Sequence, residues 1–229
     1  MEKERKFTLN GNVLFGCLII AATIIFMQTN INPYISKTIA SLLFVLCGLF
    51  NFIILRKYHK GSGYLKSVIL LIGLVFAMVG DIVLIGDFTL GAIFFAVGHV
   101  FFLFYFCTLY KISLLDIIIF LGLITFALLV IFLYPHFVFD GLLPVIIVYA
   151  VIISAMLAKA IGNYIKHRGT ANLVSLLGAF LFFFSDMMLL FYRFGGHILV
   201  FDYLCVYTYY PAEFLLALSL LLHKDNYKK

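Results

Sequence analysis

Eight long apolar stretches constrain this chain more than any other feature of its sequence. A helix rises about 1.5 Å per residue, so about 20 apolar residues are needed to cross about 30 Å of hydrocarbon. The 229 residues are 65% hydrophobic and 11% charged, whereas soluble domains are about 45–50% apolar and about 25% charged. The stretches do not alternate as membrane β-strands would. The expected spans are residues 12–29, 34–55, 64–85, 89–109, 113–133, 141–161, 172–193 and 199–222.

The breaks between these spans are short and carry turn-forming or polar residues. Examples are His59 to Gly63, Gly86-Asp87 and Lys166 to Thr170. None of them leaves room for a second soluble domain. The sequence therefore predicts one all-α domain over residues 1–229, a polytopic membrane protein with eight transmembrane helices.

Basic residues are divided unevenly between the two ends of the spans. Fourteen of the sixteen Lys and Arg residues fall on the side of the termini, and only Lys37 and Arg193 fall on the other. Because basic loops remain in the cytoplasm, this predicts cytoplasmic termini and, in a bacterium, a plasma-membrane location. The net charge of +6 then reflects topology and contact with anionic membrane lipids, not nucleic-acid binding. Arg193 and Asp202 are close enough to the interfaces to be merely solvated.

Neither a disulfide framework nor a metal centre is expected. His99 is the only histidine at mid-depth, whereas a hydrolytic zinc site built on histidine usually has three nitrogen ligands. The cysteines lack metal-binding spacing and fall within spans, where packing is their expected role. We therefore expect no metal and no cofactor. The cysteines are Cys17, Cys47, Cys107 and Cys205.

A few ionisable side chains fall at membrane depth, where a charge costs at least about 2.5–3.5 kcal/mol on insertion scales. Asp81 is expected roughly two thirds of the way along the third span, and Asp186 at a similar depth in the seventh. His99 is central in the fourth span, and Glu213 lies within the eighth. Lys37 lies near the outer end of the second span. Such groups are the first candidates for a functional site.

The two aspartates share a local pattern, G-x6-[GS]-D-x2-L-[IL], which occurs once around each of them. The copies lie four spans apart and run in the same direction. This predicts two parallel four-helix repeats, residues 12–109 and 113–222, related by a pseudo-twofold axis along the membrane normal. Such an axis would bring Asp81 and Asp186 toward each other. The alternative is a chance match between apolar-rich segments.

Four short motifs stand in order along the chain from Lys37 onward. They are Gly80-Asp81-x-x-Leu84, Gly98-His99 followed by aromatic residues, Gly178-Ala179-x-Leu181-Phe182-x-x-Ser185-Asp186, and Tyr209-Tyr210-x-Ala212. Together they resemble the YhhN-type integral membrane proteins, which are related to mammalian lysoplasmalogenase.

The resemblance implies a hydrolase that cleaves the vinyl ether of lysoplasmalogens, releasing a fatty aldehyde and a glycerophospho-base. Activity is established for only part of that family. Two positions depart from its pattern: Thr38 stands where Pro is expected, and Glu213 where Gln is expected. Glu213 adds a third carboxyl group, which can alter the charge state of the site.

Vinyl ether hydrolysis suits two buried carboxyl groups for a chemical reason. The difficult step is protonation of an alkene carbon, which gives an oxocarbenium ion that water then attacks. One carboxylic acid can supply the proton, while a carboxylate stabilises the cation and deprotonates the water, as in glycosidases. Asp81 and Asp186 are the candidate catalytic pair, and their shared pattern does not tell the acid from the base.

Seven further side chains are candidates for binding a lysophospholipid or orienting water near the aspartates. Each has a structural alternative: a histidine can hydrogen-bond within the bundle, a lysine can extend to the interface, and a tyrosine can pack with its hydroxyl satisfied. The seven are Lys37, His99, Tyr149, Ser185, Tyr209, Tyr210 and Glu213.

Two other classes of function stay open at this point. The same aspartates can form the ion or proton site of a small membrane carrier. Against a carrier, Pro144 and Pro211 fall in spans six and eight, which are not corresponding spans of the repeats. A lipid-binding or scaffolding protein without turnover would use Asp81 and Asp186 as a hydrogen-bonded pair between helices.

Overall fold

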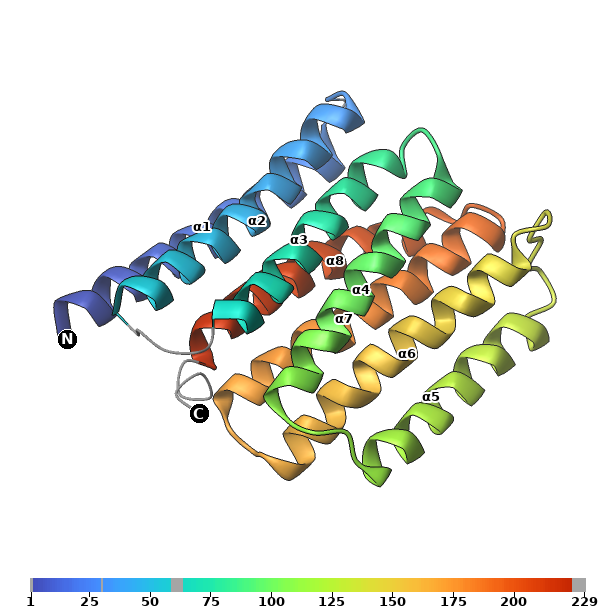
Figure 1. The fold of residues 1–229 in the computed structure, drawn as a ribbon. Helices are drawn as coiled ribbons and strands as arrows, with labels where there is room; N and C mark the ends of the chain where they lie inside the picture. The colour runs from blue at the N-terminus through green and yellow to red at the C-terminus, as the bar shows by residue number, and fades with distance from the viewer. Residues whose placement is uncertain (1, 30, 59–63, 224–229) are drawn as a thin grey trace.

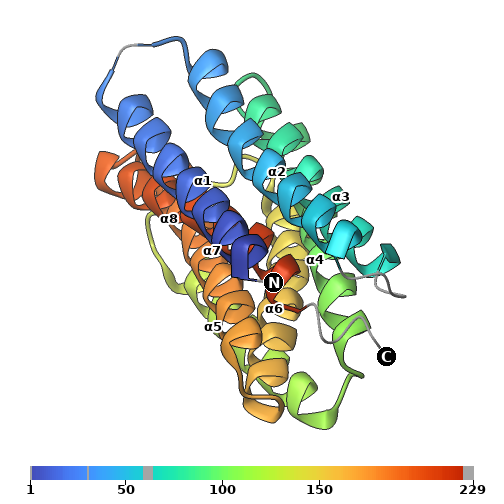
Figure 2. The same ribbon diagram turned by 90° about the vertical axis from the view of Figure 1, so that its left-hand side faces the viewer.

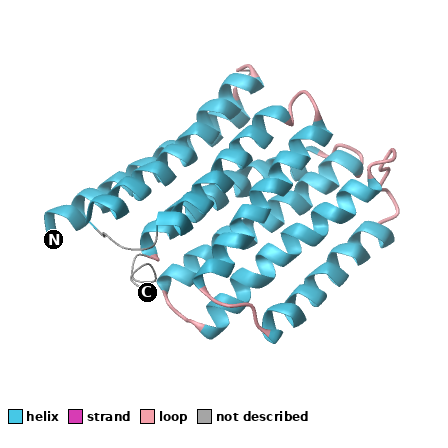
Figure 3. Cartoon of the chain, viewed as in Figure 1, coloured by secondary structure: helices cyan, strands magenta, loops and turns pink. Residues whose placement is uncertain are grey.

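The computed structural model describes residues 2–29, 31–58 and 64–223, and these form eight helices and no strands (Figure 3). All eight are long and apolar enough to cross a membrane, which confirms the predicted fold class. The expected break at His59 to Gly63 lies outside the described residues. The helices are α1 (Glu2–Gln28), α2 (Pro33–Tyr58), α3 (Tyr64–Val83), α4 (Phe88–Leu109), α5 (Leu114–Leu133), α6 (Leu143–Lys166), α7 (Thr170–Phe194) and α8 (Leu199–Leu222).

Successive helices run up and down in one bundle (Figure 1). The start of α1 and the end of α8 lie at one end, and the connections α1–α2, α3–α4, α5–α6 and α7–α8 lie at the other. We call the latter the outer end, following the predicted orientation. α1 and α2 flank one side of the bundle, and α5 lies at the far side, packed mainly on α6 (Figures 1 and 2).

The pairing of helices bears on the predicted repeat. α3 packs closely on α4 and α7 on α8, while α2 packs on α8 and α6 on α4. A rotation that exchanges the two halves would place the pair α3–α4 on α7–α8, and the pair α2–α8 on α6–α4. The internal repeat itself stays a prediction.

The first glycine of each pattern copy lets the helix that carries the aspartate approach its neighbour. A Cβ added at Gly73 would lie 2.5 Å from the ring of Phe102 on α4, and one at Gly178 would lie 3.0 Å from Leu216 on α8. Phe102 and Leu216 are both fully buried. α3 and α7 can therefore pack this closely on α4 and α8 only because glycine has no side chain at these positions. The close packing holds α3 and α7 in the core.

Asp81 lies nearer to the end of its helix than the sequence predicts. The third span is expected to continue to residue 85, but α3 ends at Val83, so Asp81 lies in the last turn of α3. The chain turns here because Asp87 caps α4, with its side chain accepting a 2.9 Å hydrogen bond from the Leu90 amide. Asp186, by contrast, lies about two turns before the end of α7 at Phe194.

A buried ion pair that the sequence pattern does not reveal holds α6 against the start of α5. Lys159 Nζ lies 3.0 Å from Asp116 Oδ2 and donates another 3.0 Å hydrogen bond to the Lys111 carbonyl. Asp116 is also the N3 residue of a capping box with Ser113. The pair lies at the end of the bundle away from the connection α5–α6, where it joins α6 to the first turn of α5.

Candidate functional site

A cavity of about 280 Å³ opens among α1, α2, α3, α4, α7 and α8 toward the outer end of the bundle. Its lining combines aromatic rings with an unusual number of polar side chains for a membrane interior. Both aspartates of the repeated pattern contribute to it, as the pseudo-twofold arrangement would require. The ionisable residues of the lining, tyrosine and cysteine apart, are Lys37, Asp81, Asp186, Arg193 and Asp202.

Asp81 is surrounded by donors from two helices. Lys37 Nζ on α2 donates to Oδ1 at 2.8 Å, and Ser41 Oγ, one turn further along α2, donates to Oδ2 at 2.6 Å. The hydroxyl of Tyr210 on α8 donates to the same Oδ2 at 2.8 Å. The carboxyl group is 3% exposed, so these three groups replace the water that it has lost. An ammonium ion and two hydroxyl donors are the surroundings that stabilise an ionised carboxylate.

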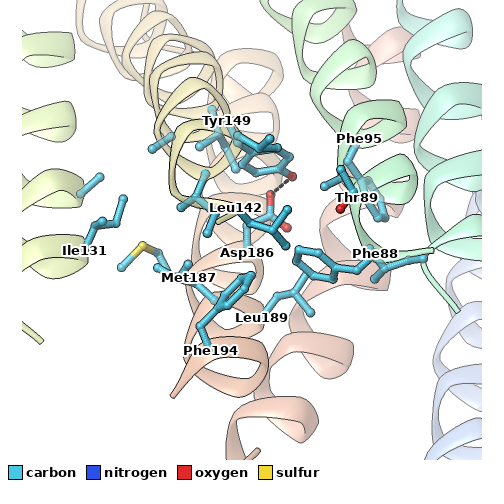
Figure 4. A pocket seen from close by; sticks show the side chains of 18 of the residues that line it. Phe88, Thr89, Phe95, Ile131, Leu142, Tyr149, Asp186, Met187, Leu189 and Phe194 are labelled. Carbon is cyan, nitrogen blue, oxygen red and sulfur yellow. Dashed lines mark hydrogen bonds between the residues drawn. The ribbon is translucent and has the colours of Figure 1, made fainter. Parts of the chain in front are cut away.

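Asp186 has fewer polar neighbours. The hydroxyl of Tyr149 on α6 donates to its Oδ2 at 2.6 Å, as Figure 4 shows. His99 Nε2 on α4 lies 3.6 Å from the same oxygen, beyond hydrogen-bond distance. Among the described residues, no Lys or Arg lies within ion-pair distance of Asp186. A carboxyl group placed in this way is better suited to holding a proton than to carrying a charge.

His99 lies in an aromatic enclosure that limits its freedom. Its ring is fully buried, with the Phe182 ring 4.4 Å away and the Tyr149 ring 5.4 Å away between centroids, both edge to face. His99 therefore helps to orient Tyr149 beside Asp186 through packing.

A second, apolar pocket meets the polar cavity at Asp186. It extends between α4, α5, α6 and α7, and Figure 4 shows aliphatic and aromatic side chains around the carboxyl group. The residues that line both the cavity and the pocket are Leu84, Phe88, Phe95, Asp186 and Leu189. Asp186 is the only ionisable group of this shared set, so it lies at the boundary between a polar and an apolar compartment.

Of the remaining predicted site residues, Ser185 and Tyr209 line the cavity and Glu213 does not. Ser185 and Tyr209 line the cavity, but their hydroxyls donate to the Cys205 carbonyl at 3.0 Å and the Ala77 carbonyl at 3.3 Å. Glu213 is fully buried, does not line the cavity, and has no hydrogen-bond partner within the described part of the chain. The structure thus brings Lys37 and Tyr210 to Asp81, and Tyr149 and His99 to Asp186.

The sequence did not predict that three further residues belong to the site. Ser41 was missed, although it stands four residues after Lys37 and therefore on the same helix face. Arg193 and Asp202 were expected to be merely solvated, and this expectation was incomplete, because both line the cavity. The end of α7, the start of α8 and the end of α3 line the cavity together. Which helices lie side by side cannot be predicted from how deep each residue lies in the membrane.

The acidic residues and histidines do not cluster further. Within residues 2–29, 31–58 and 64–223, no group of three or more His, Cys, Asp or Glu side chains is arranged to hold a metal ion. The site therefore contains Asp81 and Asp186, whose hydrogen-bond partners differ, and a third carboxyl group, Asp202, beside an apolar pocket.

Comparison with known proteins gives one match. The sequence model of the YhhN family matches residues 33–220, a range that contains all the candidate site residues. No curated protein and no solved structure matches the chain.

Proposed function

Since the chain belongs to the YhhN family, we propose that it is a membrane-embedded hydrolase that cleaves the vinyl ether bond of lysoplasmalogen-like lysophospholipids. The products are a fatty aldehyde and a glycerophospho-base. One observation carries the proposal: Asp186 lies where the polar cavity and the apolar pocket meet. In such a lipid the vinyl ether is the bond that joins the apolar chain to the polar glycerol.

The two compartments match the two halves of this substrate. The part of the alkenyl chain next to the ether enters the apolar pocket between α4, α5, α6 and α7, which has a volume of about 80 Å³, and the glycerophospho-base occupies the cavity that contains Asp81 and Lys37. The vinyl ether then lies beside Asp186.

The first chemical step needs an acid, and Asp186 supplies it. Its proton moves to the alkene carbon on the chain side, where the π electrons form the new C–H bond. The carbon attached to oxygen becomes an oxocarbenium ion. Tyr149 donates to Asp186 at 2.6 Å and stabilises the carboxylate that remains.

The second step needs a base, and Asp81 supplies it. Water attacks the oxocarbenium carbon while its proton moves to the Asp81 carboxylate, which gives a hemiacetal. The proton on Asp81 then passes to the glycerol oxygen as the C–O bond breaks, and the hemiacetal hydroxyl returns a proton to Asp186. Vinyl ether and water have become aldehyde and alcohol, and both carboxyl groups are back in their starting states.

Lys37, Ser41 and Tyr210 keep Asp81 anionic and in place until the water is deprotonated. A negative charge in the cavity also stabilises the cationic intermediate. This assignment removes the ambiguity of the repeated pattern, because the partners of the two aspartates differ even though their local sequences are alike.

The test is to incubate purified protein in detergent with lysoplasmenylethanolamine and to measure the fatty aldehyde released. Asp186→Asn and Asp81→Asn are each expected to lower kcat by about 10²–10⁴-fold, the range for loss of an acid or base group. In heavy water, the aldehyde should carry one deuterium on the carbon next to the carbonyl. Protonation of the alkene by an exchangeable acid requires that label.

Asp140→Asn provides the matched control. Asp140 is exposed, lies in the connection α5–α6, and has a φ of +45°, a conformation that asparagine also adopts readily. This variant should retain wild-type turnover. If the folded wild-type protein releases no aldehyde from any lysolipid, the hydrolase proposal is wrong, and flux of ions or lipid through proteoliposomes becomes the test of a carrier.

A further inference from the structure

The two basic residues at the outer end of the bundle line the same cavity. Of the sixteen Lys and Arg residues, only Lys37 and Arg193 depart from the predicted side of the others. Lys37 follows the start of α2, and Arg193 is in the last turn of α7. Two isolated exceptions to the charge distribution would not be expected to meet at one cavity unless the cavity needs positive charge there.

The two cations are not equally available to a ligand. Lys37 is paired with Asp81 at 2.8 Å, and Asp202 lines the same cavity. Arg193 is exposed, and among the described residues no carboxylate lies within ion-pair distance of it. Its guanidinium carbon lies 5.2 Å from the centre of the Phe88 ring. Arg193 thus lies against the wall of the cavity, and none of the acidic side chains that the structure describes forms an ion pair with it.

Phe88 connects this cation to the substrate path. Phe88 lines both the polar cavity and the apolar pocket, and so does Asp186. A guanidinium over the Phe88 ring therefore lies on the polar side of the boundary at which Asp186 stands. In a lysophospholipid, the phosphate lies on the same side of the vinyl ether, one glycerol unit away.

We propose that Arg193 binds the phosphate group of the lysophospholipid and so selects phosphate-bearing substrates over neutral glycerol ethers. This inference rests on the proposed function and extends it to recognition of the headgroup. The planar guanidinium can donate two parallel hydrogen bonds to a phosphate, which an ammonium group cannot do. The proposal also implies that the headgroup is bound at the outer end of the bundle, opposite to the start of α1.

The test measures binding with lipids that cannot be cleaved. The probes are 1-O-hexadecyl-glycero-3-phosphoethanolamine and 1-O-hexadecylglycerol, which share a saturated ether chain and differ in the phospho-base. Arg193→Gln should weaken binding of the phosphate lipid on the order of tenfold or more, as expected for loss of one charge-assisted contact. Binding of the alkylglycerol should stay unchanged. Arg193→Lys should recover part of the loss.

Arg168→Gln is the matched control, since Arg168 is an exposed arginine at the opposite end of the bundle. It should bind both lipids as the wild type does. Equal weakening of both lipids by Arg193→Gln, or no weakening of either, would overturn the assignment. Selective binding by a protein that releases no aldehyde would uphold Arg193 as the phosphate contact and refute the hydrolase proposal, so the two failures are distinguishable.

Discussion

Asp81 and Asp186 have nearly the same sequence around them and line the same cavity, yet their partners are opposite in kind. Asp81 accepts hydrogen bonds from one ammonium group and two hydroxyls, at 2.6–2.8 Å. Asp186 accepts one, from the Tyr149 phenol, and it lies between the apolar pocket and the polar cavity. A local pattern can therefore place two identical groups without determining what each of them does.

The difference comes from the neighbouring helices. Donors reach Asp81 from α2 and α8, and the side chains near Asp186 come from α6 and α4. These are the helices that the predicted repeat would equate. Lys37 and Ser41 of α2 supply a cation and a hydroxyl to Asp81, whereas Tyr149 of α6 supplies a phenol to Asp186. In the proposed mechanism, it is the partners of the two aspartates, not the sequence around them, that distinguish the base from the acid.

The largest effect on stability is expected at Lys37. Lys37→Met leaves a carboxylate buried without its cation, which should cost about 3–5 kcal/mol of unfolding free energy. Lys37→Met combined with Asp81→Asn removes both charges and should recover most of that loss. Thermal unfolding of the purified variants in detergent measures both. A double variant no more stable than Lys37→Met would show that Asp81 is not the partner whose charge matters.

A smaller loss is expected at Ser41. Ser41→Ala removes a 2.6 Å hydrogen bond to the Asp81 carboxylate, and hydrogen bonds to charged groups contribute about 1.5–3 kcal/mol. The same unfolding assay should show this loss. If Asp81 is first replaced by Asn, the effect of Ser41→Ala should shrink, because the charge is then absent; an undiminished effect would contradict an anionic Asp81.

On the Asp186 side, Tyr149→Phe should destabilise the protein by only about 0.5–1.5 kcal/mol, the usual value for one hydrogen bond. Its effect on turnover should be larger than its effect on stability, because Tyr149 stabilises Asp186 after the proton has left. Aldehyde release and unfolding measured on the same sample separate the two. Full activity in a folded Tyr149→Phe variant would remove Tyr149 from the mechanism.

The smallest stability change is expected for Asp186→Asn. A neutral amide resembles a protonated carboxyl group in shape and can still accept the hydrogen bond from Tyr149, so the loss should stay within about 1 kcal/mol. Asp81→Asn should destabilise more, since it leaves Lys37 without its anion. A reversed order in unfolding midpoints would contradict the charge states assigned here.

The fold was predictable from the sequence because apolar length is a strong signal in lipid, where every backbone group must be satisfied within a helix. The ends of helices were less predictable. The sixth span was expected to stop at residue 161, but α6 continues to Lys166. Lys159 is buried against Asp116 instead of marking an interface. The packing of α6 on α5 thus buries Lys159, which the sequence alone would place at the membrane surface.

The candidate site was predictable to the extent that polar groups at membrane depth are rare. Lys37, Asp81, Tyr149 and Tyr210 stood out for that reason, and they now lie in two hydrogen-bonded groups. Ser41 was not found, because single serines are common in packed membrane helices. The partner of each aspartate comes from distant spans, so the difference between acid and base required the packing of the bundle.

Infrared difference spectroscopy of the carboxyl groups tests the central claim most directly, since a protonated carboxyl and a carboxylate absorb at well-separated frequencies. At neutral pH, Asp186→Asn should remove a protonated-carboxyl band relative to the wild type, and Asp81→Asn should remove a carboxylate band. Asp140→Asn serves as the reference for an exposed carboxylate. Loss of a carboxylate band in Asp186→Asn, or of a protonated band in Asp81→Asn, would contradict the division of roles between the two aspartates.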